Sequence, residues 1–596
     1  MCSIIGYRGK NSAAPILVGS LKRMEYRGYD SVGVALFDSG NILVRKGTGK
    51  VVEVNKNLGI SQMAGKVGIG HTRWATHGGV TDRNAHPHSA CNNNIAVVHN
   101  GIIENYKELK EELASLGHTF ASETDSEVIA HLLETYSSSS SNSSSSSTQG
   151  IKEALIVTCK KLKGNFAFVA VFQDGTICGA RYEEPLIIGV SSEGYFVSSD
   201  VLGFLEYTDK AIFLENGDIC IIDNNSKLDI LNLDGKAIDH PITQVAWELG
   251  DIDKGRYAHY TLKEINEQKI TVVSAGRQDE ETINRFSHLV SNAKSIYITG
   301  SGTSYHSALI FKHMLARFGK IRAETVMSSE SQYALSSIDN DSVLIAISQS
   351  GETADVLDSV KLAKNQGAKI ISIVNVTTSS LARISDIFFS TNCGPEIGVA
   401  ATKSFTAQLA LIYKLIDKLC KGCFATSSAE FALAVQSIIN NQASIMRIAE
   451  QMKDCRDIYL LGRSLHYPIA LEGALKLKEL AYVHAEGIAA GELKHGPLAL
   501  MEKNTFVIML NPHDATFSDT ISNAHEIKAR GATVIGLSDR NDPVYDHWIE
   551  IPHIEQDAFY PIVEVIPLQM LAYQLALAKN ADPHYPRNLA KSVTVR

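Results

Sequence analysis

The cysteine at position 2 is the residue nearest the start of the chain whose side chain could do chemistry. If the initiator Met is removed, Cys2 carries both a thiol and a free α-amine. An α-amine has a pKa of about 7.7–8.0, so much of it is neutral near pH 7 and can accept the thiol proton. Cys2 could therefore act as a nucleophile with its own base. A cysteine considered alone more often packs in a core, so this prediction depends on its companions.

Those companions lie in three short segments. His71–Gly78 brings a guanidinium, hydroxyls, an indole and imidazoles together, and Arg73 is suited to clamp an α-carboxylate with two hydrogen bonds. At Asn100-Gly101, glycine lets a backbone N–H approach an oxyanion, and the asparagine amide can donate beside it. Asp125 could bind an α-ammonium group or could cap the following helix, and its sequence position favours neither alternative.

Taken together, these segments resemble class II glutamine amidotransferases; they are Cys2, Tyr26–Ser31, His71–Gly78, His86–His88, Asn100-Gly101 and Ser122–Asp125. The resemblance implies an N-terminal-nucleophile fold, which is a four-layer α/β/β/α sandwich. It implies that Cys2 is the nucleophile and that Asn100 and Gly101 form the oxyanion hole. It also implies a set of glutamine-binding residues, namely Arg73, Trp74, Thr76, His77, Gly101 and Asp125. Trp74 would be an indole lid on an ammonia passage, with packing in a core as the alternative.

Hydroxyl-rich loops follow two apolar strands in the second half of the chain. Ser348–Thr353 follows Val343–Ile347, and Thr303 and Ser304 follow Ser295–Gly300. Such a loop, leading into a helix, directs hydroxyls and helix N–H groups at a phosphate. The first loop has no lysine, so it does not match a nucleotide-triphosphate loop. Two loops at one sheet edge predict a phosphate site, although plain turns with capping serines are the alternative.

Charged residues farther along share one helical face. Glu472, Lys476 and Glu479 have the spacing i, i+4 and i+7. A solvated stripe of ion pairs is the usual outcome, but the small apolar neighbours would also suit a pocket wall. His495, between Gly491 and Pro497, is predicted to protrude on a turn.

The chain ends in Pro586–Arg596, which has little charge for a tail. A segment of this composition is expected to dock on the protein rather than fray.

These later motifs resemble SIS (sugar isomerase) domains, and their order behind a glutaminase resembles the amidotransferases that aminate sugar phosphates. The resemblance implies that glutamine is hydrolysed, that ammonia travels inside the protein, and that fructose 6-phosphate becomes glucosamine 6-phosphate. Glu479 would move a proton between C1 and C2 beside Lys476, and Lys591 would form a Schiff base with the ketose. His495 would open the sugar ring from a neighbouring subunit. The implied sugar-phosphate ligands are Thr303, Ser304, Ser348, Gln349, Ser350, Thr353, Val399 and Ala590.

The sequence departs from this family pattern at a few places. Ser301 stands where a cysteine is frequent, and Ala401 stands where a serine is usual, which removes a hydroxyl near the sugar. The segment Asp582–Pro586 and the terminal Arg596 also differ from the family pattern. No implied catalytic group is lost. The resemblance implies no cofactor and no metal, and it implies a homodimer or a higher homo-oligomer.

The elements that must position these residues fall into two halves. Before about residue 240, short strands such as Ile95–His99, Phe166–Phe172 and Ala211–Leu214 predominate, with helices expected near Asn105–Leu116 and Asp125–Tyr136. This half is predicted to be α+β. From about residue 255, strands alternate with helices, which predicts doubly wound parallel sheets.

An internal repeat divides the second half. Two similar strands end at Gly300 and Gly462, 162 residues apart, so we expect two α/β domains in tandem. The predicted layout is a glutaminase domain at 2–240, a linker at 241–255, SIS domains at 256–430 and 431–582, and a catalytic tail at 583–596. A length of 596 residues fits three or four domains.

Composition excludes several other classes of protein. The net charge is −9 and no basic block stands out, which argues against nucleic-acid binding. We find no apolar run of about 18 residues and no signal peptide, so the sequence predicts a cytoplasmic protein that does not bind membranes.

The nine cysteines show no paired spacing and are expected to be reduced thiols. The one C-x-x-C, Cys420 to Cys423, lacks a second pair, so neither a metal nor a redox role is expected there. Ser137–Ser147 is low in complexity and is predicted to be a mobile surface insertion, with a phosphorylated regulatory loop as the alternative.

Two other functions stay open at this point. A glutaminase could feed a different acceptor, as in phosphoribosyl pyrophosphate amidotransferases, but no acidic pyrophosphate-binding run is present. A non-enzymatic sugar-phosphate sensor would not need Cys2, Glu479 and Lys591 together.

Overall fold

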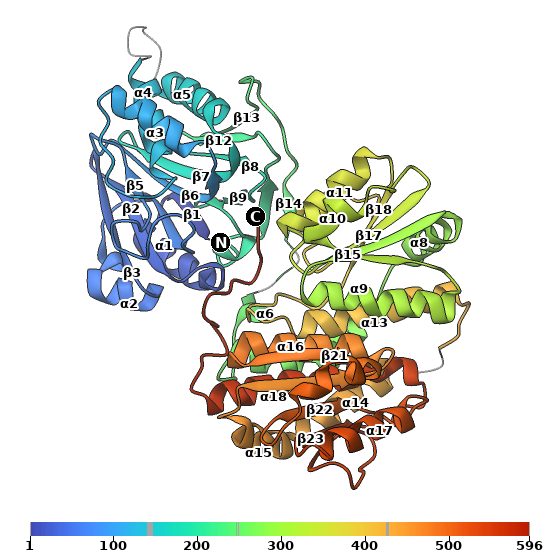
Figure 1. Ribbon diagram of the computed structural model, residues 1–596. Coiled ribbons are helices and arrows are strands. Elements are labelled where there is room, and N and C mark those ends of the chain that lie inside the picture. Colours follow the sequence, from blue (N-terminus) through green and yellow to red (C-terminus); the bar gives the residue numbers. More distant parts are fainter. Residues whose placement is uncertain (1, 140–146, 246, 248, 425–427, 595–596) are drawn as a thin grey trace. The chain divides into compact units, whose positions relative to one another are not determined.

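The computed structural model describes residues 2–139, 147–245, 247, 249–424 and 428–594. The chain forms two compact units (Figure 1). The first unit contains the chain up to Asp251 together with the last residues from Ser592, and the second unit is Ile252–Lys591.

The first unit is a sandwich of two sheets between two layers of helices. One sheet has the order β14-β11-β9-β10-β1-β4-β2-β3, and the other has the order β13-β12-β8-β7-β6-β5. The strands of the first sheet are β1 (Ser3–Gly9), β2 (Ser31–Asp38), β3 (Asn41–Thr48), β4 (Val67–Arg73), β9 (Ile187–Ser191), β10 (Gly194–Ser198), β11 (Lys210–Phe213) and β14 (Thr243–Gln244). Those of the second are β5 (His88–Ser89), β6 (Ile95–Ile103), β7 (Gly164–Phe172), β8 (Ile177–Tyr182), β12 (Ile219–Ile222) and β13 (Leu228–Leu231).

Helices cover the outer faces of both sheets. The first sheet carries α1 (Ala13–Arg23) and α2 (Val51–Leu58), and the second carries α3 (Tyr106–Ser115), α4 (Glu127–Ser139) and α5 (Ser147–Lys161). Side chains alternate between the two faces of a strand, so in β7 Val169 packs between the sheets while Phe168 packs against α4 and α5. These layers confirm the predicted α/β/β/α sandwich.

The second unit contains two parallel sheets with the same strand order. One is β16-β15-β17-β18-β19 and the other is β21-β20-β22-β23-β24. The strands of the first are β15 (Ser295–Gly300), β16 (Glu324–Met327), β17 (Ser342–Ser348), β18 (Lys369–Val374) and β19 (Ile387–Ser390). Those of the second are β20 (Asp457–Gly462), β21 (His484–Ala489), β22 (Phe506–Leu510), β23 (Thr533–Ser538) and β24 (His547–Glu550). This repetition confirms the tandem α/β domains.

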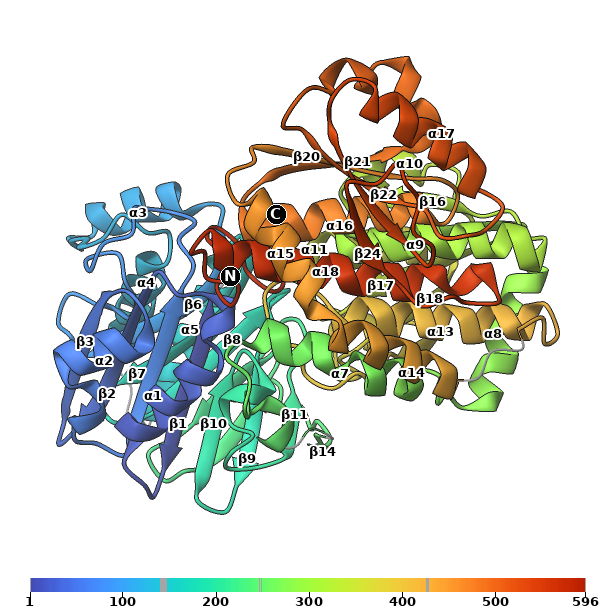
Figure 2. The ribbon, with the colours of Figure 1, turned by 90° about the horizontal axis from the view of Figure 1, so that it is seen from below.

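The helices of the second unit are α6 (Leu249–Ile252), α7 (Tyr260–Ala275), α8 (Glu280–Asn292), α9 (Thr303–Met314), α10 (Ser331–Ala334), α11 (Ala354–Asn365), α12 (Ser380–Ile384), α13 (Lys403–Leu419), α14 (Ser428–Asn440), α15 (Gln442–Met452), α16 (His466–Ala481), α17 (Phe517–Lys528) and α18 (Tyr560–Ala578), with α6 beginning just before the unit boundary. Helix α18 packs against α13, α14, α15 and α16 (Figure 2). These contacts join both sheets to one core.

The structure adds detail to three expectations from the sequence. Among its described residues, the first unit has helices α1, α2 and α5 in addition to the two predicted near α3 and α4. The predicted linker 241–255 contains β14 and α6. The Ser-rich insertion falls mainly on residues 140–146, which lie outside the described residues, and its ends belong to α4 and α5.

The most apolar helix also differs from expectation. Among the described residues, Asp557–Ala578 is long and apolar enough to cross a membrane by length and composition, with a mean hydropathy of 1.4. Its most apolar window is 83% buried inside the protein, as expected for a core helix.

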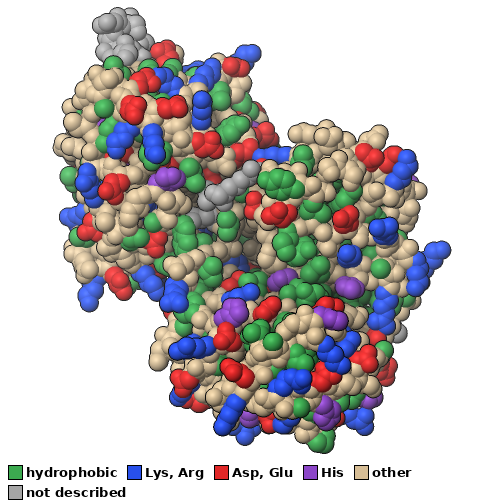
Figure 3. Space-filling model, viewed as in Figure 1, with side chains coloured by type: hydrophobic (Ala, Val, Ile, Leu, Met, Phe, Trp, Pro, Cys, Tyr) green, Lys and Arg blue, Asp and Glu red, His purple; other side chains and the backbone are tan. Residues whose placement is uncertain are grey.

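The view of the surface in Figure 3 shows acidic and basic side chains interspersed, in keeping with the lack of a basic block.

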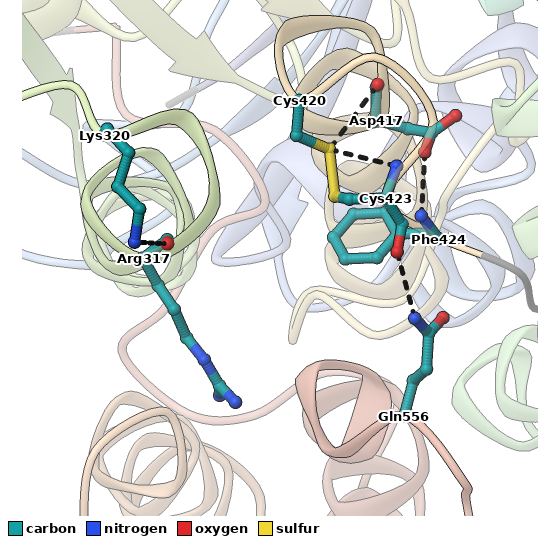
Figure 4. The surroundings of a disulfide bond; sticks show 7 residues. All are labelled: Arg317, Lys320, Asp417, Cys420, Cys423, Phe424 and Gln556. Carbon is teal, nitrogen blue, oxygen red and sulfur yellow. Dashed lines mark hydrogen bonds between the residues drawn. A yellow bond between two sulfur atoms is a disulfide. The ribbon is translucent and has the colours of Figure 1, made fainter.

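The prediction that all cysteines are reduced thiols is wrong for the two at the end of α13. Cys420 and Cys423 form a disulfide with a Cα–Cα distance of 5.5 Å (Figure 4). Their spacing of three residues, at the last turn of the helix, brings the Cα atoms within the usual range for a disulfide. Asp417 accepts a hydrogen bond from the N–H of Phe424, and the Gln556 amide donates to the carbonyl of Cys423.

Candidate active sites

Strand pairing in the first unit places Cys2 beside Trp74. Strand β1 is antiparallel to β4, with Ser3 opposite Thr72, so the residues just beyond this pair are neighbours. The N–H of Trp74 donates to Cys2 Sγ over 3.2 Å, and Sγ lies 3.5 Å from the Trp74 carbonyl oxygen. Burial raises the pKa of the Cys2 thiol, while the Trp74 N–H and Arg73 act in the opposite direction. A base is therefore needed to form the thiolate.

Asn100 and Gly101 lie on β6, next to Cys2. Asn100 Nδ2 donates to the Cys2 carbonyl over 3.0 Å, and its Oδ1 lies 3.2 Å from His71 Nε2. Burial lowers the pKa of His71 to about 3, so this ring is neutral. His71 Nε2 also faces the His99 carbonyl, which can only accept; the ring therefore donates, and the amide nitrogen of Asn100 is turned toward Cys2.

Gly101 has a φ of +115°, a backbone conformation that favours glycine. A Cβ at this position would lie 2.0 Å from the carbonyl oxygen of Asn165 on β7. Any side chain here would displace the backbone, so the chain requires glycine beside Asn100.

The glutamine-binding residues implied by the resemblance partly come together. Arg73 donates to the carbonyls of His77, Gly78 and Gly79, which folds the loop after β4 back on its own guanidinium. Burial lowers the pKa of Arg73, whereas the charges of Cys2, Asp30 and Asp125 raise it, so these groups share one electrostatic environment.

Asp125 lies just before α4. It is 3% exposed, and its Oδ2 accepts a hydrogen bond from the N–H of Ile103 on β6 over 2.8 Å. This contact joins it to the strand that carries Asn100. His77 and Trp74 are half-buried, and Thr76 is exposed.

In the second unit, a buried carboxylate is the centre of a polar cluster. Glu472 on α16 accepts from Thr303 Oγ1 over 3.0 Å and lies 2.6 Å from His306 Nδ1, both on α9. Lys476 Nζ lies 3.3 Å from Glu472, 2.7 Å from Glu479 and 3.2 Å from Thr303 Oγ1. Glu472 and Lys476 are fully buried, so this face of α16 is not a solvated stripe.

Charge pairing fixes the protonation of this cluster. Burial alone would lower the pKa of Lys476, but the carboxylates of Glu472 and Glu479 raise it above its usual value. Burial likewise opposes ionisation of Glu472, yet Lys476 and His306 lower the pKa of this carboxyl. Lys476 is therefore a fixed cation next to Glu479, whose side chain is 21% exposed.

The two hydroxyl loops lie at one edge of a sheet, as predicted. Strands β15 and β17 are parallel neighbours, so the loops that follow them meet at their carboxyl ends. Ser348 Oγ lies 3.1 Å from Thr353 Oγ1 and accepts from the N–H of Gly351. Gly351 has a φ of +66°, and a Cβ there would lie 2.1 Å from Ser379 Oγ.

Other predicted ligands lie around these loops. Ser304 Oγ accepts from Gln408, and Gln349 and Ser350 are half-buried in the loop after β17. Val399 is 8% exposed. Ser301, which replaces the frequent cysteine, hydrogen-bonds Ser328 over 2.5 Å.

The tail is docked, as predicted. Lys591 forms an ion pair with Glu396, and its side chain is 4% exposed. Glu396 also accepts from the backbone N–H groups of Thr402 and Ser404 and from the Ser404 hydroxyl. Burial would raise the pKa of Glu396, but Lys591 and these hydrogen bonds lower it to about 2.

A second carboxyl lies close to this pair. Glu264 accepts from the backbone N–H groups of Ile397 and Gly398. Burial and the neighbouring Glu396 raise the pKa of Glu264 to about 7.

His495 ends a short 3-10 helix (Ala490–His495) and is exposed, which confirms that it protrudes.

Comparison with known proteins finds matches for both units of the chain. A glutamine amidotransferase domain model matches residues 71–206, and an SIS domain model matches 289–417 and 451–579. The chain is 44% identical to the glutamine–fructose-6-phosphate aminotransferase (isomerizing) of Thermococcus kodakarensis and 44% identical to that of Pyrococcus horikoshii, with all of each chain covered. The chain belongs to the glutamine–fructose-6-phosphate aminotransferase family.

A solved structure also matches the second half of the chain. The C-terminal domain of the aminotransferase from Francisella tularensis is 36% identical, with a TM-score of 0.50, and covers 56% of this chain and 99% of its own. The family assignment thus agrees with the parallel sheets of the second unit.

Within this family architecture, sequence reasoning missed four residues that support the predicted sites. Glu472 was noted only as part of a charged stripe, and His306, Glu396 and Glu264 were not singled out. Each acts on a partner from a distant part of the chain, as Glu396 does on Lys591, 195 residues away. No local pattern marks such pairs, apart from the helical spacing that links Glu472 to Lys476.

Proposed function

We propose that this chain releases ammonia from glutamine at Cys2 and transfers it to fructose 6-phosphate, which it converts to glucosamine 6-phosphate. The observation that carries the proposal is the presence of both sites in one chain: Cys2 is held beside Trp74 and Asn100, and buried Lys476 pairs with Glu479 and contacts Thr303.

At the first site, the Cys2 sulfur attacks the side-chain amide carbon of glutamine. The α-amine of Cys2, free once Met1 is absent, takes the thiol proton and returns it to the departing ammonia. Asn100 Nδ2 and the N–H of Gly101 stabilise the oxyanion. Water then cleaves the thioester and releases glutamate.

Other residues position glutamine and guide ammonia. Arg73 and Asp125 bind the α-carboxylate and the α-ammonium of glutamine, together with Thr76 and His77. Trp74 covers the passage through which ammonia leaves without meeting bulk water, which would protonate it and end its nucleophilicity.

At the second site, Ser348, Gln349, Ser350, Thr353, Thr303 and Ser304 bind the sugar phosphate, with Val399 and Ala590 alongside. Lys591 forms an imine with the ketose carbon; the amine nitrogen bonds to carbon and water leaves. Ammonia then displaces Lys591. Glu479 moves the proton between C1 and C2, and the Lys476 ammonium lies 2.7 Å from its carboxylate.

The assembly and layout are part of the same proposal. We assign 2–240 to the glutaminase domain, 241–255 to the linker, 256–430 and 431–582 to the SIS domains, and 583–596 to the tail. The exposed position of His495 supports a homodimer in which it opens the sugar ring in the partner's site. The ordinary composition and the buried position of the most apolar helix support a cytoplasmic protein.

The test compares Cys2→Ala with the parent chain. Glutamate release should vanish in the variant, while conversion of fructose 6-phosphate to its aldose isomer should persist, because the two clusters use different residues. Glucosamine 6-phosphate should form from glutamine only in the parent chain. Glutamate release by the variant would refute the role of Cys2, and a parent chain that makes no amino sugar would refute the acceptor.

A further inference from the structure

Four side chains with metal-binding atoms converge in the first unit, outside the residues assigned above. Cys91 lies in the turn between β5 and β6, His118 follows α3, and His131 and Glu134 are one turn apart on α4. In Figure 1, α3 and α4 lie on the same side of the sheet that contains β6 and β7. Their donor atoms all lie within 4.8 Å of one another. We propose that these four residues form a structural zinc site.

The distances match those between the ligands of a tetrahedral ion. Cys91 Sγ lies 3.6 Å from Nδ1 of both His118 and His131, and the two Nδ1 atoms are 3.2 Å apart. Glu134 Oε2 lies 3.2 Å from His118 Nδ1 and 3.8 Å from His131 Nδ1. Nitrogen, oxygen and sulfur ligands around tetrahedral zinc are separated by roughly 3.3–3.8 Å, given metal–ligand bonds of about 2.0–2.3 Å.

Polar groups on the far side of each ring, a hydrogen-bond partner for His118 and a carboxylate for His131, orient the Nδ1 atoms into the cluster. Thr135 Oγ1 donates to the His131 carbonyl, so it accepts the 2.9 Å hydrogen bond from His118 Nε2. His131 Nε2 lies 3.5 Å from a Glu127 carboxylate oxygen, which can only accept. An imidazole that carries its proton on Nε2 presents an Nδ1 lone pair, which is the atom that each ring directs at the cluster. Metal-binding histidines are oriented by outer partners in this way.

Without a cation, the cluster has too few donors. Two Nδ1 atoms, a carboxylate oxygen and a sulfur atom face one another at 3.2–3.8 Å, and all four can act as acceptors. Cys91 Sγ accepts a further hydrogen bond from the N–H of Thr119. Glu134 is held by the N–H groups of Cys91 and Asn92. A cation bound by the four atoms would replace repulsion with attraction.

The donor set selects zinc. One thiolate, two imidazoles and one carboxylate form a borderline-soft set, and Zn²⁺ prefers such ligands in a closed tetrahedron when its role is structural. His131 and Glu134 are nearly fully buried, while Cys91 is exposed, so an ion could enter from the surface. The ion would join three segments that are separate in sequence. The sequence prediction of no metal is revised by this proposal.

The test measures zinc in the full-length protein after loading with Zn²⁺ and dialysis against metal-free buffer. We expect one zinc ion per chain in the parent and a loss of nearly all of it in Cys91→Ser and His118→Gln. Cys455→Ser and His484→Gln are matched controls elsewhere in the chain and should retain the ion. Thr135→Val should weaken binding roughly 10–100-fold, as removal of a partner behind a ligand does.

Cobalt provides a second readout, which reports the geometry and the sulfur ligand of the site directly. Co²⁺ bound to the parent should give the visible bands of a tetrahedral ion and a sulfur-to-cobalt charge-transfer band, and the latter should vanish in Cys91→Ser. The proposal is overturned if the parent retains no zinc after dialysis. It is also overturned if Cys91→Ser and the parent retain equal amounts, which would place the ion elsewhere.

Discussion

Replacing Lys591 separates the ion pair that this residue forms with Glu396 from its proposed role in a Schiff base. Lys591→Met removes both the ion pair with Glu396 and the amine that the proposed Schiff base needs. Lys591→Arg keeps a cation for Glu396 but cannot form an imine near neutral pH. Both variants should stop making glucosamine 6-phosphate and should keep releasing glutamate. Only the methionine variant should lose the stability that the ion pair provides.

The pKa of Glu396 sets the size of that loss. Burial would raise this pKa, but Lys591 and several hydrogen bonds lower it from 4.5 to about 2. A shift of this size corresponds to roughly 3 kcal/mol. Because the folded-state pKa is depressed, this stabilisation is present above the unfolded-state pKa and disappears as the pH falls toward about 2. Removing Lys591 takes away the largest favourable cause, so most of the stabilisation should be lost near pH 7.

The assay is thermal unfolding of the full chain across this pH range, with a parallel assay of both activities. The melting temperature of Lys591→Met should fall furthest below that of the parent at neutral pH, and the difference should shrink as Glu396 becomes protonated. Lys494→Met, which breaks an exposed ion pair with Glu526, is the matched control and should cost at most about 1 kcal/mol. A deficit in Lys591→Met that does not change with pH would refute the electrostatic reasoning.

Three further predictions test other parts of the sites. Gly101→Ala should lower the glutaminase kcat roughly 10²–10³-fold by displacing a proposed oxyanion donor. Gly79→Ala should keep the parent rate, because an added Cβ there meets no atom within 4 Å, and equal rates for the two variants would refute the steric argument. Mixing His495→Ala with Glu479→Gln chains should restore about a quarter of the parent activity if the sites are shared across a dimer, and no recovery in proven heterodimers would place both residues in one subunit. Burial alone would lower the pKa of His466, but the carboxylates of Glu564 and Asp514 raise it to about 10. The stabilisation from this ion pair is therefore complete below about pH 6.5 and is lost as the pH rises toward about 10. Melting curves of His466→Gln should lack this alkaline loss.

Local patterns predicted the elements best. The strands that end at Gly300 and Gly462 have the bounds expected from their apolar runs, because a buried parallel strand is apolar along its whole length. The pattern failed for the first unit's α1, whose apolar run reads equally as helix or strand without tertiary context.

The disulfide was missed for a different reason. A spacing of three residues permits a bond between Cys420 and Cys423, but it also occurs in helices whose thiols stay apart. The bond depends on the way the chain leaves α13, where Lys421 adopts a positive φ. The residue type at that position carries no clear signal of this turn.

Residues that act on distant partners were beyond a reading of local spacing. The helical spacing of Glu472, Lys476 and Glu479 placed them on one face, but a single helix cannot reveal what that face meets. The neighbour is α9 from the other α/β repeat, which brings Thr303 and His306 onto Glu472 and excludes water from it. A stripe that would be solvated on an isolated helix thereby becomes a buried network, in which Glu472 and Lys476 each stabilise the charge of the other. The identity of the catalytic candidates was thus readable from sequence, whereas their protonation states required the contact between the two repeats.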